Sequence, residues 1–308
     1  MKFKRYHKSM QLDDSQMIPE APSCAFCFSK DRIPVWVLQN NPAVTLLLCR
    51  NCDAVSASRM PTGETLSDFY NDYYDEKSYY GKGNKVTFDL TNKFAKHIMR
   101  LAARHLKQNK LSLLDFGGGD GSMAVQLGKE LLKTTCSQIH ITVVDYHTVL
   151  PAVDDDRIQL EFAADLADVI SDGYHLVIAS AVLEHLPEPG KTLARLLSLL
   201  KIDGLFYART PYMLPFMRGA HSIGHEWDFH YPSHLHDLGP LFWNKIFPII
   251  DPGNSYRTLR SQPSIVETSF RKHFLRTLIA YGFKLPWYLL GNRYKMVGGW
   301  EILTIKSQ

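Results

Sequence analysis

The stretch LLDFGGGDG, residues 113–121, lies where a predicted strand ends and a predicted helix begins. Glycines at such a junction permit a tight turn and let a ligand approach the backbone, while the start of the helix offers free N–H groups. The spacing is Asp-x-Gly-x-Gly-x-Gly, with glycines at Gly117, Gly119 and Gly121. The dinucleotide fingerprint has its third glycine one place later, where this chain has Ser122. The loop therefore predicts a bound ligand and argues against a dinucleotide.

Strand and helix patterns alternate along the chain beyond this loop. The predicted strands are residues 111–116, 139–145, 157–162, 174–179 and 204–209, with helices at 122–132 and 191–201. Strands that alternate with helices form a parallel sheet with helices on both faces. The end of the chain is predicted to hold a helix at 269–283, a strand around 287–290, a turn at Gly291-Asn292 and a last strand at 298–306. The whole pattern predicts an α/β fold.

Polar side chains follow the predicted strands at their carboxyl ends, where ligands of open α/β folds bind. Asp145 ends the second strand, where a carboxylate can accept hydrogen bonds from both hydroxyls of a ribose. Asp165 follows the third strand, where it can meet an adenine amino group, and Asp168 is nearly as well placed. Ser180 lies at the end of the fourth strand. We therefore expect the ligand to lie across this edge of the sheet.

Four motifs together resemble those of class I methyltransferases that use S-adenosylmethionine (SAM). LLDFGGGDGSMAVQL resembles their cofactor loop, VVDYH their ribose acid, LVIASAVLEHLPEP their fourth-strand motif and GLFYARTP their fifth strand. The resemblance covers nearly the whole chain and is closest to bacterial members with a leading zinc module, including sugar C-methyltransferases. It implies a Rossmann-like, doubly wound sheet of the seven-stranded methyltransferase type, preceded by a small module like a zinc ribbon. The SAM contacts that we expect are Asp115, Gly117, Gly119, Gly121, Asp145, Tyr146, Asp165 and Ser180.

Four of the five cysteines form two closely spaced pairs. Cys24-x-x-Cys27 and Cys49-x-x-Cys52 have 21 residues between them. Four thiolates in a tetrahedral array satisfy Zn²⁺ and leave no position open for water, so Cys24, Cys27, Cys49 and Cys52 predict a structural zinc site. The alternative is four free thiols in a core. Cys136 lies apart and is predicted to be buried and inert.

Composition limits the compartment and the partners. The formal charge of +4, without a long Lys/Arg run, gives no argument for DNA or RNA as a partner. The absence of a run of about 18 apolar residues, and of an apolar stretch near the start, predicts a cytoplasmic protein without a membrane span. The sequence leaves the oligomeric state open. The predicted segments are a polar start (1–20), a zinc-binding module (21–61), a helical lead-in (62–110) and a methyltransferase domain (111–308) with a His-rich insertion (211–262).

Methyl transfer from a sulfonium is an in-line displacement, and a hydroxyl or carbon acceptor also needs a base. His185, just beyond the fourth strand, is the first candidate for this base. The alternative is that Glu184-His185 only begins the next helix. The His-rich stretch 219–238 offers three further candidates, for which structural roles or a metal site are alternatives. These candidates are His225, Glu226 and His234.

The resemblance favours a small, carbohydrate-linked acceptor, such as a nucleotide sugar or a polysaccharide precursor. Sugar C-methyltransferases have a Glu-His pair where this chain has Ser233-His234, and this departure makes O-methylation as good a hypothesis as C-methylation. A second hypothesis is a zinc-ribbon RNA methyltransferase. Against it, segment 24–61 has few basic residues and no Asn-Pro-Pro-Tyr motif follows the fourth strand. A third hypothesis is a SAM-binding protein without catalysis.

Overall fold

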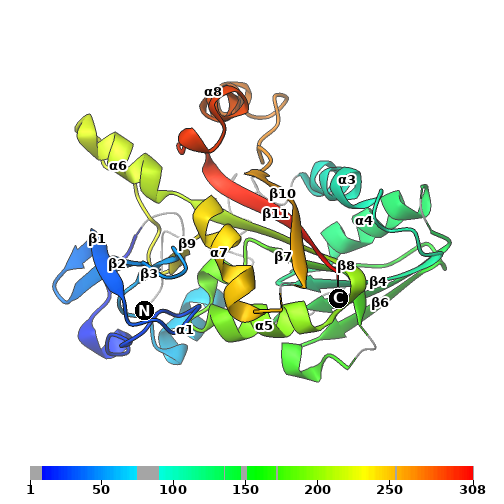
Figure 1. The fold of residues 1–308 in the computed structure, drawn as a ribbon, viewed down its shortest axis with the longest axis horizontal. Coiled ribbons are helices and arrows are strands. Elements are labelled where there is room, and N and C mark those ends of the chain that lie inside the picture. Colours follow the sequence, from blue (N-terminus) through cyan, green and yellow to red (C-terminus); the bar gives the residue numbers. More distant parts are fainter. Residues whose placement is uncertain are drawn as a thin grey trace.

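We describe the fold from a computed structural model, which describes residues 9–74, 90–134, 136–146, 151–170, 173–253 and 255–307. Its largest element is a seven-stranded sheet in the order β10-β11-β8-β7-β4-β5-β6 (Figure 1). Strands β8, β7, β4, β5 and β6 are parallel, and β11 is antiparallel to both of its neighbours. This sheet confirms the predicted doubly wound α/β fold. The strands are β4 (Lys110–Phe116), β5 (Gln138–Val144), β6 (Ile158–Ala163), β7 (Tyr174–Ser180), β8 (Leu200–Tyr212), β10 (Tyr256–Pro263) and β11 (Gly298–Lys306).

Each face of the large sheet packs into its own hydrophobic cluster. Successive side chains of a strand point to opposite faces, so Val177 and Ala179 of β7 join one cluster, and Leu176 and Ile178 join the other. Helices α5 and α7 bury apolar residues in the first cluster, and α3 and α4 in the second. Helices thus cover both faces, as the alternating pattern predicted. Their bounds are α3 (Thr91–Ala102), α4 (Ser122–Leu132), α5 (Pro189–Ser198) and α7 (Pro240–Ile250).

A second, smaller sheet has the order β1-β2-β3-β9. Strand β9 comes from the His-rich segment and pairs antiparallel with β3, with His236 opposite Ser56. A third hydrophobic cluster joins this sheet to α6 (Leu214–Ser222). The His-rich and the cysteine-bearing segments therefore share one sheet. Its strands are β1 (Arg32–Asn40), β2 (Ala43–Cys49), β3 (Val55–Ala57) and β9 (His236–Asp237).

The cysteine-bearing segment packs directly on the start of α5. The backbone N–H of Gly190 donates to the carbonyl oxygen of Ala25 at 3.2 Å. A Cβ atom on Gly190 would lie 2.6 Å from the carbonyl oxygen of Phe26, which is too close for any side chain. The segment between Cys24 and Cys27 thus contacts the start of α5 backbone to backbone.

Two helical regions lie before and after the large parallel part of the sheet, and one prediction in the second region is wrong. The described part of residues 62–110 includes the helices α1 (Gly63–Tyr74) and α3. The strand predicted around 287–290 is wrong, because α8 (Phe274–Leu290) continues through it and a 3₁₀ turn, Gly291–Arg293, follows. Leu289 and Leu290 are good helix formers, and Pro286 lies inside the helix. Among the described helices, none is long and apolar enough to cross a membrane.

Candidate functional site

The glycine loop joins β4 to α4 in a conformation that side chains disfavour. The φ angles are 70° at Gly117, 58° at Gly119 and 74° at Gly121, all in the left-handed region. A Cβ atom on Gly117 would also lie 2.6 Å from Cγ2 of Val182. Helix α4 begins at Ser122, so its first backbone N–H groups have no partner within the helix. Because the glycines lack a Cβ atom, a ligand can approach the loop backbone closely, and the N–H of Ser122 at the helix start donates to Oδ1 of Asp120 at 2.9 Å.

Two carboxylates flank this loop. Oδ2 of Asp145 accepts a hydrogen bond from the backbone N–H of Gly119 at 2.8 Å. Asp115 is 2% exposed, and its Oδ2 has no hydrogen-bond partner among the described atoms. Burial raises the pKa of Asp115 to about 7, and the nearby Asp145 and Asp120 act in the same direction. Asp115 therefore keeps its proton at mildly acidic pH.

The other predicted SAM contacts lie along the same edge. Tyr146 follows Asp145 and is 80% exposed. Oδ1 of Asp165 accepts a hydrogen bond from the backbone N–H of Ala167 at 2.7 Å and so caps the 3₁₀ turn Leu166–Asp168. Ser180 ends β7 and accepts a hydrogen bond at 3.1 Å from Nε of Arg209.

Arg209 is a residue of this edge that the sequence reasoning missed. It lies near the carboxyl end of β8, is 9% exposed and forms an ion pair with Glu267. Its guanidinium lies 4.9 Å from the centre of the Phe94 ring. Its position in the sequence could have identified it. Ligands of open α/β folds bind at the carboxyl ends of the strands, and this rule applies to β8 as it does to the strand that ends at Ser180.

Three titratable side chains meet just beyond β7. Glu184, His185 and His234 each offer a ligand atom within 4.8 Å of the other two. Glu184 and His185 belong to the 3₁₀ turn Leu183–His185, and His234 precedes β9. The structure thus brings together two predicted catalytic histidines that are far apart in the sequence, and it adds Glu184.

Hydrogen bonding fixes the tautomer of His185. Nδ1 of His185 lies 2.6 Å from the carbonyl oxygen of Ser233, which can only accept, so Nδ1 carries the hydrogen. Nε2 of His185 lies 3.8 Å from Oε1 of Glu184. Glu184 is 2% exposed, burial raises its pKa, and its Oε2 has no hydrogen-bond partner among the described atoms. The cluster therefore combines an imidazole nitrogen able to take up a proton with a buried carboxyl group.

The other polar residues of the His-rich segment lie outside this cluster. His225 and Glu226, both predicted catalytic residues, are exposed on the stretch after α6. His236 is fully buried between Oγ of Ser56 and the carbonyl oxygen of Leu186, each at 2.8 Å, and burial lowers its pKa to about 4. His236 therefore has a structural role, one of the alternatives left open for this segment.

The four paired cysteines form a compact cluster in which all are free thiols. Sγ of Cys24 lies 3.6 Å from Sγ of Cys52, and Sγ of Cys27 lies 3.5 Å from Sγ of Cys49. A tetrahedral Zn²⁺ site with Zn–S bonds of about 2.3 Å has sulfur–sulfur separations of about 3.8 Å. Asn51 Nδ2 also donates to Sγ of Cys27 at 3.5 Å. The donor set and its spacing therefore fit Zn²⁺.

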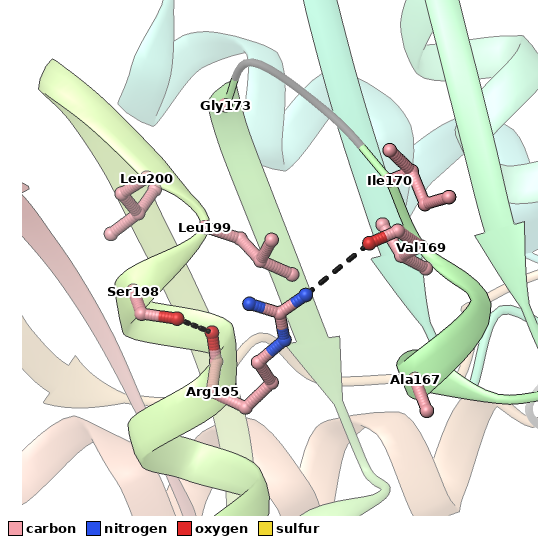
Figure 2. Close-up of a pocket in the computed structure, with 8 residues that line it drawn as sticks. All are labelled: Ala167, Val169, Ile170, Gly173, Arg195, Ser198, Leu199 and Leu200. Atoms are coloured by element: carbon pink, nitrogen blue, oxygen red, sulfur yellow. Dashed lines mark hydrogen bonds between the residues drawn. The ribbon is translucent and has the colours of Figure 1, made fainter.

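A shallow pocket lies at the opposite edge of the large sheet, near the amino end of β7 (Figure 2). Its walls include Leu199 and Arg195, and the Arg195 guanidinium donates to the carbonyl oxygen of Val169 at 3.3 Å. The glycine loop and the Glu184 cluster lie instead at the carboxyl ends of the strands, so we do not assign the reaction to this pocket.

Comparison with known proteins defines the family. Residues 88–242 match the family described as a methyltransferase domain. The chain therefore belongs to this methyltransferase domain family, and it is a SAM-dependent methyltransferase, as the resemblance implied. No curated protein sequence matches the chain.

Solved structures with a similar fold are distant in sequence. The plantazolicin methyltransferase BpumL in complex with SAH is 15% identical, with a TM-score of 0.44, over 80% of this chain and 98% of that chain. The magnesium protoporphyrin IX methyltransferase from Synechocystis PCC 6803, also with SAH, is 14% identical, with a TM-score of 0.47, over 78% and 100%. The 1,6-didemethyltoxoflavin-N1-methyltransferase of Burkholderia thailandensis is 15% identical, with a TM-score of 0.47, over 79% and 87%.

The buried carboxyl of Asp115 predicts a pH dependence of stability. Its folded pKa of about 7 exceeds the unfolded value of 3.8, so the folded state binds more protons between these values and loses stability as the pH rises through them. Asn cannot ionise, so we expect Asp115→Asn to gain stability relative to the parent protein from pH 4 to pH 7. At about 1.4 kcal/mol per pKa unit, the gain is on the order of 4 kcal/mol. Urea unfolding across this range measures it, and parallel pH profiles for the two proteins would contradict it.

Proposed function

We propose that the enzyme methylates a small, carbohydrate-linked acceptor, such as a nucleotide sugar or a polysaccharide precursor, with a histidine as general base. The proposal of a histidine base is supported by the cluster of Glu184, His185 and His234 beyond the carboxyl end of β7. The acceptor class rests on the resemblance to bacterial sugar methyltransferases with a leading zinc module. O-methylation and C-methylation both use such a base.

The cluster has the parts that general-base catalysis needs. His185 is held with its hydrogen on Nδ1, so the lone pair on Nε2 is available for the acceptor proton. The carboxylate of Glu184 would stabilise the imidazolium that forms, since burial strengthens the attraction between the two charges. As the acceptor oxygen or carbon bonds to the methyl group, the sulfur–methyl bond breaks, its electron pair stays on sulfur and the acceptor proton moves to the imidazole.

Glu184 also bears on the choice between O- and C-methylation. Ser233 stands where the sugar C-methyltransferases have a glutamate, and the sequence alone thus lacks an acid beside His234. In this proposal the carboxylate of Glu184 takes that place from a different segment of the chain. Removal of a proton next to a ketone then has both a base and a charged partner, so C-methylation stands level with O-methylation.

For the cofactor, we propose that the backbone of Gly117, Gly119 and Gly121 contacts the methionine end of SAM and that Asp145 accepts from the ribose hydroxyls. Support comes from the left-handed φ angles of the three glycines and from the position of Asp145 beside Gly119. Further proposed contacts along the edge are Asp115, Tyr146, Asp165 and Ser180.

The role of Asp145 predicts a loss of SAM affinity on substitution. Hydrogen bonds to a charged acceptor contribute about 1.5–3 kcal/mol each, so Asp145→Ala should weaken SAM binding by roughly 10- to 100-fold or more. Isothermal calorimetry with SAM and its demethylated product measures the change. Asp154→Ala is the matched control, because Asp154 is an exposed aspartate paired with Lys129. Equal affinities of the Asp145 variant and the parent protein would remove Asp145 from the site.

The role of the histidine cluster predicts a loss of turnover at unchanged SAM affinity. A general base contributes about 10²- to 10⁴-fold, so His185→Ala and His234→Ala should each lower kcat by a factor in this range, and Glu184→Gln by less. Transfer from isotope-labelled SAM to a panel of nucleotide sugars measures kcat. His140→Ala is the control, because His140 lies on β5, outside the cluster, and pairs with Glu161 on β6.

Two results would contradict this assignment. If both histidine variants keep full turnover, the base lies elsewhere, and His225 and Glu226 are the next residues to test. If the protein methylates RNA and no sugar nucleotide, the proposed acceptor class is wrong, but the proposed SAM contacts of the glycine loop are unaffected.

We also propose that Cys24, Cys27, Cys49 and Cys52 bind one structural Zn²⁺ in a reducing compartment such as the cytoplasm. Four thiolates leave Zn²⁺ no open position, so the ion would support folding and take no part in catalysis. In this proposal residues 21–61 form the zinc-binding module and residues 111–308 the methyltransferase domain.

This zinc site predicts about one Zn²⁺ per chain in the purified protein. Cys27→Ser should reduce the zinc content to near zero and lower the unfolding temperature, because a site with three thiolates binds the ion more weakly. Elemental analysis and thermal unfolding measure both effects. Cys136→Ser is the matched control, since Cys136 lies outside the cluster, and an equal loss of zinc in both variants would refute the site.

A further inference from the structure

Helix α8 exposes apolar side chains around most of its circumference. Thr277 is its only buried residue. Figure 1 shows the helix at the margin of the molecule, outside the layers of the large sheet. Soluble monomers rarely leave a continuous apolar surface of this kind in water. The largest exposures include Phe274, Leu275, Leu285, Tyr288 and Leu289, with exposed fractions from 63% to 85%.

The charged side chains of this helix and of its immediate flanks are all basic. Residues 268–300 contain six Lys or Arg residues and no Asp or Glu. Arg271, Lys272 and Arg276 lie before or within the first turns of α8, and Arg293 and Lys295 follow its end, all of them exposed. The apolar surface is therefore flanked at both ends by positive charge.

We infer that α8 docks the enzyme on the surface of an anionic lipid bilayer. A helix with exposed apolar side chains and flanking cations lies in the interface, with the apolar side chains among the acyl chains and the cations at the lipid phosphates. Tyr288, which is 71% exposed, suits the headgroup level, where aromatic side chains concentrate. The helix has 17 residues, and Arg276 and Lys284 lie within it, so it would lie on the bilayer and not cross it.

The charges argue against a second copy of the chain as the partner that covers the apolar surface of α8. Both ends of α8 are positive, so two copies packed along this helix would bring like charges together in either direction. A bilayer that contains anionic lipid instead offers phosphates to both ends at once.

Docking through α8 would hold the catalytic edge close to the lipid surface. The hydroxyl of Thr277 donates to that of Thr268 at 2.8 Å, and Nζ of Lys284 donates to Oγ of Ser264 at 3.1 Å. The segment 264–268 between these contacts also holds Glu267, which pairs with Arg209 at the carboxyl edge of the sheet. Helix and site are therefore linked by one short segment. The inference does not depend on the identity of the acceptor.

The test is co-sedimentation of the full chain with vesicles of phosphatidylcholine alone or mixed with phosphatidylglycerol. Because several cations would lie near the lipid phosphates, we expect at least about tenfold tighter binding to the mixed vesicles, and high salt should weaken it. Leu275→Glu and Leu289→Glu should each lower that binding by about tenfold or more, because each removes an apolar side chain that the bilayer would bury and adds a negative charge.

Ile202→Glu is the matched control, because Ile202 is an exposed apolar residue, 67% exposed, on strand β8. It should bind vesicles as the parent protein does, and unchanged SAM affinity in all three variants shows that each is folded. Failure of the parent protein to bind mixed vesicles overturns the inference. The inference is also overturned if light scattering detects a dimer that Leu289→Glu dissociates. The apolar surface of α8 would then be a contact between two copies of the chain.

Discussion

The pairing of β9 with β3 is the constraint on which the arrangement of the candidate site depends. Strand β9 has only two residues, but His236 within it also bonds to Ser56 and to the carbonyl oxygen of Leu186. One residue before it, the N–H of Leu235 donates to the carbonyl oxygen of Glu184 at 2.8 Å. Leaving one such buried group unpaired costs about 1–3 kcal/mol. These bonds therefore hold His234 against the turn that carries Glu184 and His185.

The cysteine cluster supports the same arrangement from the other side. Cys49 ends β2 and Cys52 lies shortly before β3, so the second cysteine pair shapes the connection to the strand that β9 joins. Ala25 and Phe26, which lie between the two cysteines of the first pair, contact Gly190 at the start of α5, the helix that follows the turn of His185. A structural metal at these thiols, as proposed, would thus stabilise both the sheet that positions His234 and the helix next to His185. The cysteine cluster and the histidine cluster are therefore connected through β3, β9 and α5.

The cofactor side of the site depends on local geometry. Gly117, Gly119 and Gly121 reach the left-handed region because they lack a Cβ atom, and Asp145 closes on the loop from the adjacent parallel strand. The cofactor side of the site therefore depends only on β4, the glycine loop, α4 and the neighbouring strand β5. For helix α8, position in the fold and not local geometry is decisive. Its sequence is as apolar as that of a core helix, and only its place at the margin of the fold leaves it exposed.

The sequence by itself therefore determined the elements whose signals are local. Alternation of strands and helices predicted the sheet, the glycine spacing predicted the ligand loop, and the two CxxC pairs predicted the cysteine cluster. It misassigned residues 287–290, since an apolar run of this length suits either a strand or a helix and only its continuity with α8 decides. The tertiary structure alone decided that Glu184 and His185 meet His234 and that Arg209 reaches Ser180. These contacts join segments separated by many residues, and strand pairing and burial, which no short stretch of sequence encodes, bring them together.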